Sequence, residues 1–230
     1  MIFSFLLLLL VLLICVGYMF FFKKGKEEQY KNNLAVSVSV FSLLVFLVLF
    51  VGEMSGHWDM INQSVSLFVI SFRNDSLTSF FIFITSIAGG TIMTLLSLLF
   101  VGALFFLRNK KIFPSVIAIL CGVLSGMMLK EFLRIARPTF SLISETGFSF
   151  PSGHALMSTI FFALVYKDLK NEVSEKKGRF LFGVLCASLV FLVCLSRIYL
   201  GVHFFADVLA GFFLGIFWVS FWWALLSSRR

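Results

Sequence analysis

Long apolar runs recur along this chain, separated by short loops that carry charged residues. The hydrocarbon core of a bilayer is about 30 Å thick, and a helix of roughly 20 apolar residues spans it. Hydrophobic residues occupy 60% of the 230 positions, so too few polar side chains remain to cover a water-soluble domain of this size. The sequence therefore predicts an all-α polytopic membrane protein.

Seven of these runs are candidate membrane spans. They lie at 1–22, 34–51, 77–107, 112–129, 154–166, 180–195 and 204–226. The third run has Gly89 and Gly90 at its middle, so we expect either a strongly tilted helix or a helix broken at that point. The basic residues near the first run follow its apolar part, which favours a span over a signal peptide. Six spans remain an alternative to seven.

The basic residues predict the orientation of these spans, because lysine and arginine accumulate in short cytoplasmic loops. Of the 19 basic residues, four lie in 23–33, three in 108–111, five in 167–179 and two at the C-terminus. All four segments share one side of a seven-span topology, which we expect to be the cytoplasm. The formal charge of +8 then reflects topology and contact with anionic headgroups, and its scatter over separate loops argues against nucleic-acid binding.

Three of the remaining basic residues lie in the segment KEFLRIARP, residues 130–138. An ionised group near the end of a span is costly unless it meets a partner or a ligand. Lys130 and Arg137 are seven residues apart, so two helical turns would place them on one face. Arg134 would lie between them, and Pro138 would end the helix. This spacing predicts a cationic stripe, with snorkelling of the side chains to headgroups as the alternative.

A second segment, SRIYLGVHFFAD at 196–207, places a histidine and a carboxylate one helical turn apart. His203 and Asp207 are at positions i and i+4 of a helix, where the carboxylate can hold one ring nitrogen and fix the tautomer. The other ring nitrogen is then free to act as a nucleophile or a base. A structural pair that bridges two helices is the alternative.

The third segment, PSGH at 151–154, joins a polar loop to an apolar run. Ser152 is a favoured N-cap, and Gly153 allows a ligand to approach the backbone closely. The free N–H groups at such a helix start bind anions, and His154 lies at the same point. Three cations of the other segments would complement it: Lys130, Arg137 and Arg197. The combination predicts a site for an anion with several oxygens, and phosphate fits best.

These three segments resemble the motifs of the type 2 phosphatidic acid phosphatase superfamily, KxxxxxxRP, PSGH and SRxxxxxHxxxD. Each matches without a substitution and in the family's order. The resemblance covers 59–230, and ETGFSFPSGH is similar in particular to bacterial phosphatidylglycerol phosphate and undecaprenyl pyrophosphate phosphatases. It implies a six-helix membrane core of this type over 34–230. An extra N-terminal transmembrane helix and a cytoplasmic loop would occupy 1–33.

The resemblance also implies a role for each matching residue. His203 would attack phosphorus to form a phosphohistidine, Asp207 would orient it, and His154 would act as general acid and then as general base. The residues implied to hold the phosphoryl oxygens are Lys130, Arg137, Ser152, Gly153 and Arg197. Because these cations take the part of metal ions in kinases, neither a metal nor a cofactor is expected. Arg134 and Glu145, outside the motifs, are candidates for substrate contact or for ion pairs in a loop.

We therefore expect a metal-independent lipid phosphatase at the outer face of a bacterial cytoplasmic membrane. Undecaprenyl pyrophosphate and phosphatidylglycerol phosphate are the favoured substrates. Its partners would be the lipid phosphate and the bilayer, with neither nucleic acid nor an obligate protein partner. A lipid phosphotransferase that uses the same site is one alternative, and a non-enzymatic lipid transporter or binding protein is another.

One further segment, 58–73, combines apolar and polar residues at helical spacing. Its apolar stripe consists of Trp58, Ile61, Val65, Phe68 and Phe72. Such a stripe predicts an amphipathic helix that lies in the outer membrane interface, close to the three motifs.

Overall fold

Every regular element is a helix in the part of the chain that this computed structural model describes, residues 26–107 and 112–227. In chain order the helices are α2 (Lys26–Met54), α3 (Asp59–Ile70), α4 (Asp75–Ile87), α5 (Gly90–Phe106), α6 (Ile112–Leu133), α7 (Gly153–Leu169), α8 (Lys176–Tyr199) and α9 (Phe205–Ser227). The predicted all-α fold is confirmed. The apolar run at 1–22, predicted to be the first span, lies outside the described residues.

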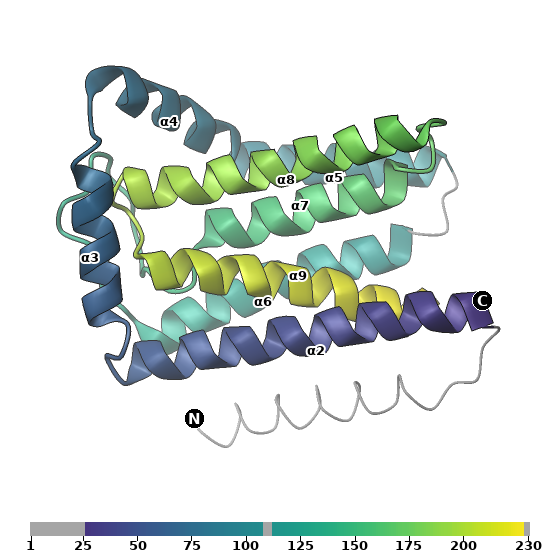
Figure 1. The fold of residues 1–230 in the computed structure, drawn as a ribbon, viewed down its shortest axis with the longest axis horizontal. Coiled ribbons are helices and arrows are strands. Elements are labelled where there is room, and N and C mark those ends of the chain that lie inside the picture. The colour runs from purple at the N-terminus through teal and green to yellow at the C-terminus, as the bar shows by residue number, and fades with distance from the viewer. Residues whose placement is uncertain (1–25, 108–111, 228–230) are drawn as a thin grey trace.

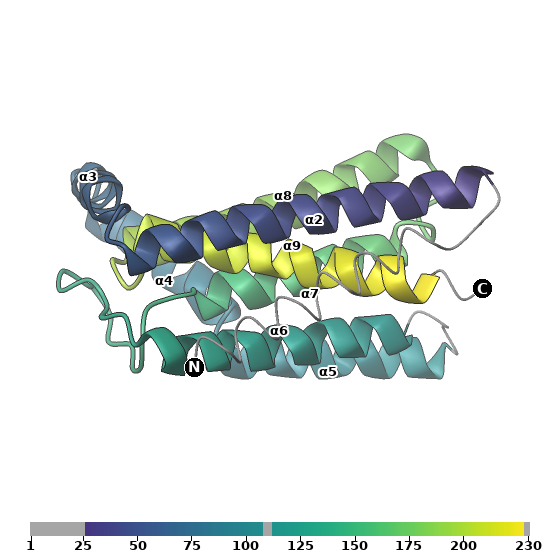
Figure 2. The same ribbon diagram turned by 90° about the horizontal axis from the view of Figure 1, so that it is seen from below.

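Helices α2 and α5 to α9 run lengthwise in an elongated bundle (Figures 1 and 2). Helix α9 contacts α2, α6 and α7, and its side chains Phe217 and Phe221 join Phe46 of α2 in the buried core. The outer faces of the bundle expose large apolar side chains such as Leu99 and Phe191. Exposure of so large an apolar surface to water is unfavourable, so these faces contact lipid.

Four described helical stretches are long and apolar enough to cross a membrane: Asn32–Met54, Ile112–Leu133, Lys176–Tyr199 and Phe205–Leu226. Helices α4 and α5 form a fifth crossing if the pair is counted as one span. The chain bends by 44° between them, and Gly89 has an extended conformation there. Of the two alternatives predicted for 77–107, the broken helix is the one observed.

Helix α7 begins inside the protein. Ser152 and Ala155 at its start are fully buried. Gly211 and Gly215 of α9 allow the two helices to approach closely, since a Cβ atom at Gly215 would lie only 3.0 Å from the carbonyl oxygen of Leu156. The GFFLG pattern of α9 therefore serves packing within the chain.

Helix α3 runs crosswise over one end of the bundle (Figures 1 and 2). Its polar side chains Asn62 and Ser66 are buried, whereas Leu67 and Phe68 are exposed. The predicted amphipathic helix is confirmed, but its apolar stripe does not all face outward. Val65 packs inward against a cluster that joins α7, α8 and α9. This helix therefore directs Asn62, Val65 and Ser66 towards the bundle, and Leu67 and Phe68 away from it.

The helix that carries KEFLRIARP ends earlier than the spacing predicts. Helix α6 stops at Leu133, and Arg134 has a left-handed backbone conformation with φ of 50°. The chain from there to Arg137 is not helical. The prediction of a cationic stripe along one helix face is therefore wrong, because Pro138 restricts only the residue before it and the turn at Arg134 has already redirected the chain. Lys130 and Arg137 approach the same loop from different directions.

Candidate active site

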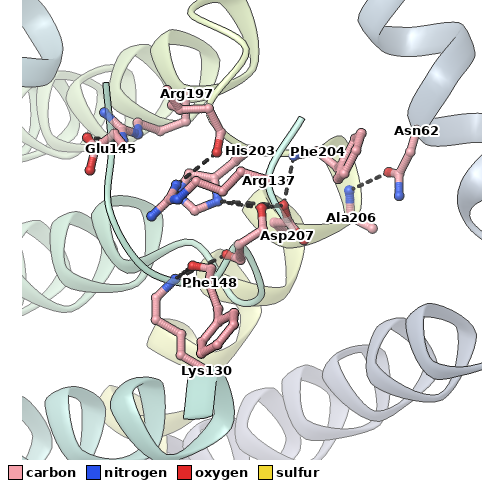
Figure 3. A network of polar contacts seen from close by, with 12 residues as sticks. Asn62, Lys130, Arg137, Glu145, Phe148, Arg197, His203, Phe204, Ala206 and Asp207 are labelled. Atoms are coloured by element: carbon pink, nitrogen blue, oxygen red, sulfur yellow. Dashed lines mark hydrogen bonds and ion pairs between the residues drawn. The ribbon is translucent and has the colours of Figure 1, made fainter. Parts of the chain in front are cut away.

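The predicted site residues converge at the end of the bundle that α3 crosses (Figure 3). They come from the end of α6, the loop that leads into α7, the last turn of α8 and the turn that leads into α9. Figure 3 shows Lys130, Arg137 and Arg197 around His203 and Asp207. The fold thus brings together segments that lie up to about 80 residues apart in the sequence.

His203 lies in the turn between α8 and α9, where Gly201 has a positive φ of 71°. The prediction that His203 and Asp207 share a helix is wrong, because α9 begins only at Phe205. The predicted pairing nevertheless forms, with Nδ1 of His203 3.5 Å from Oδ2 of Asp207. The same carboxylate oxygen accepts the N–H of Phe204 across 2.7 Å, which closes the first turn of α9 and fixes the carboxylate.

The contacts of the buried imidazole define its tautomer. Nε2 of His203 lies 3.1 Å from Nη1 of Arg137. A guanidinium only donates hydrogen bonds, so Nε2 accepts and carries the lone pair, and the proton sits on Nδ1. Nδ1 faces Asp207 and lies 3.3 Å from Oγ of Ser149. Burial, followed by the charge of Arg197, lowers the pKa of His203 well below its ordinary value, so the ring is neutral at pH 7.

Ser149 is a residue of this site that the sequence motifs do not include. Its hydroxyl is buried and donates to Oδ2 of Asp207 across 2.5 Å. A hydroxyl can donate and accept at once, so Ser149 is also placed to accept from Nδ1–H of His203. The sequence signal for Ser149 is its place immediately before Phe150 and the PSGH segment.

Arg197 is fully buried in the last turn of α8, and two side chains hold its guanidinium. Nη2 donates to Oε1 of Glu145 across 2.5 Å, and Nη1 donates to the hydroxyl of Thr85 on α4. Burial raises the pKa of Glu145, but the hydrogen bond and the charge of Arg197 outweigh it and keep that pKa below its ordinary value. Glu145 therefore stays ionised and compensates part of the positive charge. No sequence pattern indicates Thr85.

Lys130 and Arg137 hold the loop that precedes α7. Nζ of Lys130 donates to the carbonyl oxygens of Phe148 and Ser149, at 2.6 and 3.1 Å. The guanidinium of Arg137 donates to three carbonyl oxygens at 2.9 to 3.0 Å, those of Thr146, Gly147 and Val202. Burial lowers the pKa of Arg137, which still remains ionised at pH 7. These two residues shape the loop around His203 and also supply positive charge.

The PSGH segment begins α7 as predicted, with Ser152 at the N-cap position and Gly153 as the first helical residue. The hydroxyl of Ser152 is buried and pairs with no described residue, and Nε of Arg197 is in the same situation. A Cβ atom at Gly153 would meet no atom within 4 Å, so open space adjoins this helix start. Buried donors without acceptors, next to open space, suit a ligand rich in oxygen atoms.

His154 follows Gly153 in the first turn of α7 and is partly buried. It lies within electrostatic range of Arg197, Glu145 and His203. Both histidines therefore belong to one cluster, although they lie 49 positions apart in the sequence.

Arg134 lies at the edge of this cluster rather than in it. Its side chain is 70% exposed, 3.9 Å from the carboxylate of Glu131. Its guanidinium lies over the ring of Phe148, with the ring centroid 5.8 Å away. The structure thus separates Arg134 from the buried cations, whereas Glu145, the other residue predicted outside the motifs, belongs to the buried network.

No group of three or more His, Cys, Asp or Glu side chains is placed to hold a metal ion in the part of the chain that the structure describes. The positive charge of the site comes from lysine and arginine. A helical membrane bundle that buries a neutral histidine, paired with a carboxylate, among such cations is that of an integral membrane protein with a site suited to an anion. The chain belongs to the PAP2 (type 2 phosphatidic acid phosphatase) superfamily, whose family model matches residues 111–230.

Similar proteins agree with this assignment. Phosphatidylglycerophosphatase B from Bacillus subtilis (strain 168) is 29% identical over 184 residues, which cover 78% of this chain and 89% of that protein. Undecaprenyl-diphosphatase from Sulfolobus acidocaldarius is 35% identical over 127 residues, 51% of this chain and 56% of that protein. The crystal structure of a transmembrane PAP2 type phosphatidylglycerolphosphate phosphatase from Bacillus subtilis has a TM-score of 0.76 at 25% identity, covering 84% of this chain and 97% of that one. The predicted family and its membrane fold are confirmed.

Proposed function

We propose that this chain is a metal-independent lipid phosphatase that removes the terminal phosphate of a membrane lipid through a phosphohistidine intermediate. The observation that carries the proposal is the environment of His203. Its Nε2 carries a lone pair that points at Arg137, one of the cations, while its Nδ1 proton is held by Asp207 and Ser149. A neutral imidazole oriented in this way is a competent nucleophile towards phosphorus.

In the first step, Nε2 of His203 attacks phosphorus, and an N–P bond forms as the P–O bond to the lipid breaks. The electron pair of that bond leaves with the lipid oxygen, which takes a proton from the imidazolium form of His154. The negative charge that the substrate brings into this cluster favours that protonated form. Asp207 meanwhile stabilises the positive charge that develops on the ring of His203.

In the second step, a water molecule attacks the phosphohistidine. The P–N bond breaks, and its electron pair returns to Nε2 of His203. His154, now neutral, takes a proton from the water and so recovers its initial state, as microscopic reversibility requires. Inorganic phosphate leaves, and the site is ready for another lipid.

The phosphoryl oxygens would be held by Lys130, Arg137, Arg197, the hydroxyl of Ser152 and the N–H of Gly153. Phosphoryl transfer depends mainly on positioning and on stabilisation of charge by such an array. Arg197 requires a rearrangement, because Glu145 and Thr85 occupy two of its donor atoms before substrate binds. We keep Arg134 and Glu145 as candidates for contact with the remainder of the headgroup.

The active site would face the outside of a bacterial cytoplasmic membrane. The five basic residues of 167–179 lie around the α7–α8 connection, at the end of the bundle opposite the site (Figure 1). By the distribution of basic residues that end is cytoplasmic. The names of the two similar proteins favour phosphatidylglycerol phosphate and undecaprenyl pyrophosphate as substrates. We further propose that 34–230 form the phosphatase domain and that 1–33 add one span and its cytoplasmic connection to that domain; the predicted loop at 23–33 is helical from Lys26, where α2 begins.

The decisive experiment measures phosphate release by the purified full chain, with EDTA present, from undecaprenyl pyrophosphate, phosphatidylglycerol phosphate and phosphatidic acid in parallel. We expect turnover of at least one of the first two lipids and none by His203→Ala. A strict requirement for added divalent metal, or equal release by His203→Ala, would contradict the mechanism. Transfer of labelled phosphate to another lipid in the same mixture would identify a phosphotransferase.

A further inference from the structure

Helix α3 reaches the candidate active site through Asn62. Its side chain is 3% exposed, and Oδ1 accepts the backbone N–H of Ala206 across 3.0 Å (Figure 3). Ala206 lies in the first turn of α9, whose N–H groups have no acceptor within their own helix. Asn62 therefore acts as an N-cap that is supplied from another helix, 144 positions earlier in the chain.

The turn that Asn62 caps is the one that carries Asp207. Asp207 follows Ala206 directly, and its carboxylate bonds both the N–H of Phe204 and the hydroxyl of Ser149. A change in the position of this turn would move the carboxylate relative to Nδ1 of His203. Few other contacts determine the direction of that carboxylate, since its Oδ1 has no hydrogen-bond partner among the described residues.

Hydrophobic contacts bring α3 against the same group of elements. Val65 of α3 packs on a buried cluster of Ala155, Ile198 and Val208. These three residues are the immediate neighbours of His154, Arg197 and Asp207. The inner face of α3 therefore supports the backbone at three of the predicted site residues.

The carboxylate of Glu53, at the end of α2, lies near the side chain of Asn62. It is close enough to the amide of Asn62 and to Asp207 to interact with both. An amide side chain can donate to a carboxylate on one side and accept a backbone N–H on the other. This capacity suits an asparagine at a buried position between Glu53 and the N–H of Ala206.

Ser66 lies one turn further along the same buried face and is a polar residue with a contact only inside α3. Its hydroxyl bonds the carbonyl oxygen of Asn62 within α3 and contacts no site residue by a hydrogen bond. Ser66 therefore matches Asn62 in burial and helix face but lacks the connection to α9.

We propose that Asn62 is a positioning residue for the phosphatase reaction. It ties α3 to the first turn of α9 through the N–H of Ala206 and so holds Asp207 in register with His203. This inference rests on the proposed function, because it concerns the efficiency of the same nucleophile. The proposal gives α3 a role in catalysis, although α3 contains none of the three sequence motifs.

The first test compares Asn62→Leu with Ser66→Ala in turnover of a lipid phosphate in mixed micelles. Leucine has nearly the shape of asparagine but cannot accept from Ala206. We expect kcat of Asn62→Leu to fall by about 10- to 100-fold, as is typical when a catalytic group is displaced. KM should stay within about twofold, because the phosphate-binding cations are untouched. Ser66→Ala should keep both constants. Full kcat in Asn62→Leu, or a rise in KM alone, would overturn the proposal.

A charge-conserving exchange provides the second test. Asn62→Asp keeps an acceptor for Ala206 but places a second carboxylate against Glu53, so we expect low kcat. In the double variant Glu53→Gln/Asn62→Asp the amide and the carboxylate change places, so the repulsion is removed while the carboxylate at position 62 still accepts the N–H of Ala206. The double variant should recover at least about tenfold in kcat over Asn62→Asp. A double variant no better than Asn62→Asp would overturn the proposal, even if Asn62→Leu could not be purified in folded form.

These outcomes are distinct from failure of the proposed function. If the wild-type chain released no phosphate from any of the three lipids, the phosphatase assignment itself would be wrong. If the wild-type chain were active and the Asn62 variants behaved like Ser66→Ala, only the positioning role would be lost.

Discussion

The hydroxyl of Ser149 lies between Asp207 and His203, 2.5 Å from Oδ2 of the carboxylate and 3.3 Å from Nδ1 of the ring. The direct distance from Nδ1 to that carboxylate oxygen is longer, at 3.5 Å. Ser149 therefore shares with Asp207 the task of holding the ring proton, and the pair predicted from sequence is in fact a group of three.

Ser149→Ala should lower kcat by about 10- to 100-fold, since a hydrogen bond to a charged group is worth about 1.5–3 kcal/mol. The measurement is steady-state turnover of a lipid phosphate. Ser158→Ala is a matched control, because Ser158 is also a buried serine but its hydroxyl bonds only the carbonyl oxygen of Ala155 in its own helix. Equal kcat for the two variants would show that Ser149 has no part in orienting the ring.

His203→Ala and His154→Ala should fail in different ways. Without His203 no phosphoenzyme can form. Without His154 the loss is about 10²–10⁴-fold and depends on the leaving group. A nitrophenolate leaves without a proton, so with such a substrate His154→Ala should accumulate phosphohistidine, because water is no longer activated.

Acid quenching followed by detection of acid-labile, base-stable phosphoprotein measures this intermediate. The wild-type chain, which turns the intermediate over, serves as the comparison for its level. Trapped phosphate in His203→Ala and none in His154→Ala would reverse the two assigned roles.

Gly211→Ala should destabilise the protein and lower its activity. The new Cβ atom would press on the carbonyl oxygen of Ser152 and lie 3.1 Å from the backbone nitrogen of Leu156. Backbone atoms cannot move aside as a side chain can, so we expect a loss of about 1–3 kcal/mol. The N–H of Ser152 also donates to the carbonyl oxygen of Asp207 across 2.9 Å, so the distortion would reach the site.

Gly102→Ala is the control for that substitution, since a Cβ atom at Gly102, in the C-terminal part of α5, meets nothing within 4 Å. Replacement of glycine by alanine inside a helix should then stabilise by up to about 1 kcal/mol. Thermal unfolding in detergent compares the two variants. Similar melting temperatures would contradict the close packing of α9 against α7.

The contribution of His203 to the stability of the protein should fall as the pH drops below about 6.5, the ordinary pKa of histidine. Burial lowers the pKa of His203 in the folded state, so below pH 6.5 the unfolded chain binds a proton that the folded chain does not. This contribution is therefore full above that pH and is lost towards lower pH. Glu145, whose folded pKa is also lowered, keeps its contribution above its ordinary pKa of 4.5 and loses it only at lower pH.

The measurement is the melting temperature between pH 8 and pH 5.5 for the wild-type chain and for His203→Asn, which has no titratable ring. The wild-type melting temperature should decline more steeply below pH 6.5. Parallel curves would show that His203 does not contribute to the pH dependence.

Features that depend on residue type and on neighbouring residues in the chain could be predicted from the sequence. The broken span at Gly89 and the start of α7 at Ser152 depend on local backbone preferences, and both were expected. Sequence reasoning failed at Arg134 and His203, where the chain leaves helical geometry although the spacing on either side suits a helix. Spacing along a chain gives distances only if the conformation between the residues is known, and tertiary contacts set that conformation here.

The sequence by itself determined the membrane fold, the family and the chemical groups that meet at the site, because apolar runs and three complete motifs depend on residue identity. Only the tertiary structure decided how those groups are supported. Ser149, Thr85 and Asn62 lie outside the motifs, and each contacts a motif residue or its direct neighbour that is distant in the sequence. A single uncharged polar side chain carries no pattern of its own, and its part becomes visible only when folding places it within hydrogen-bonding distance of a partner.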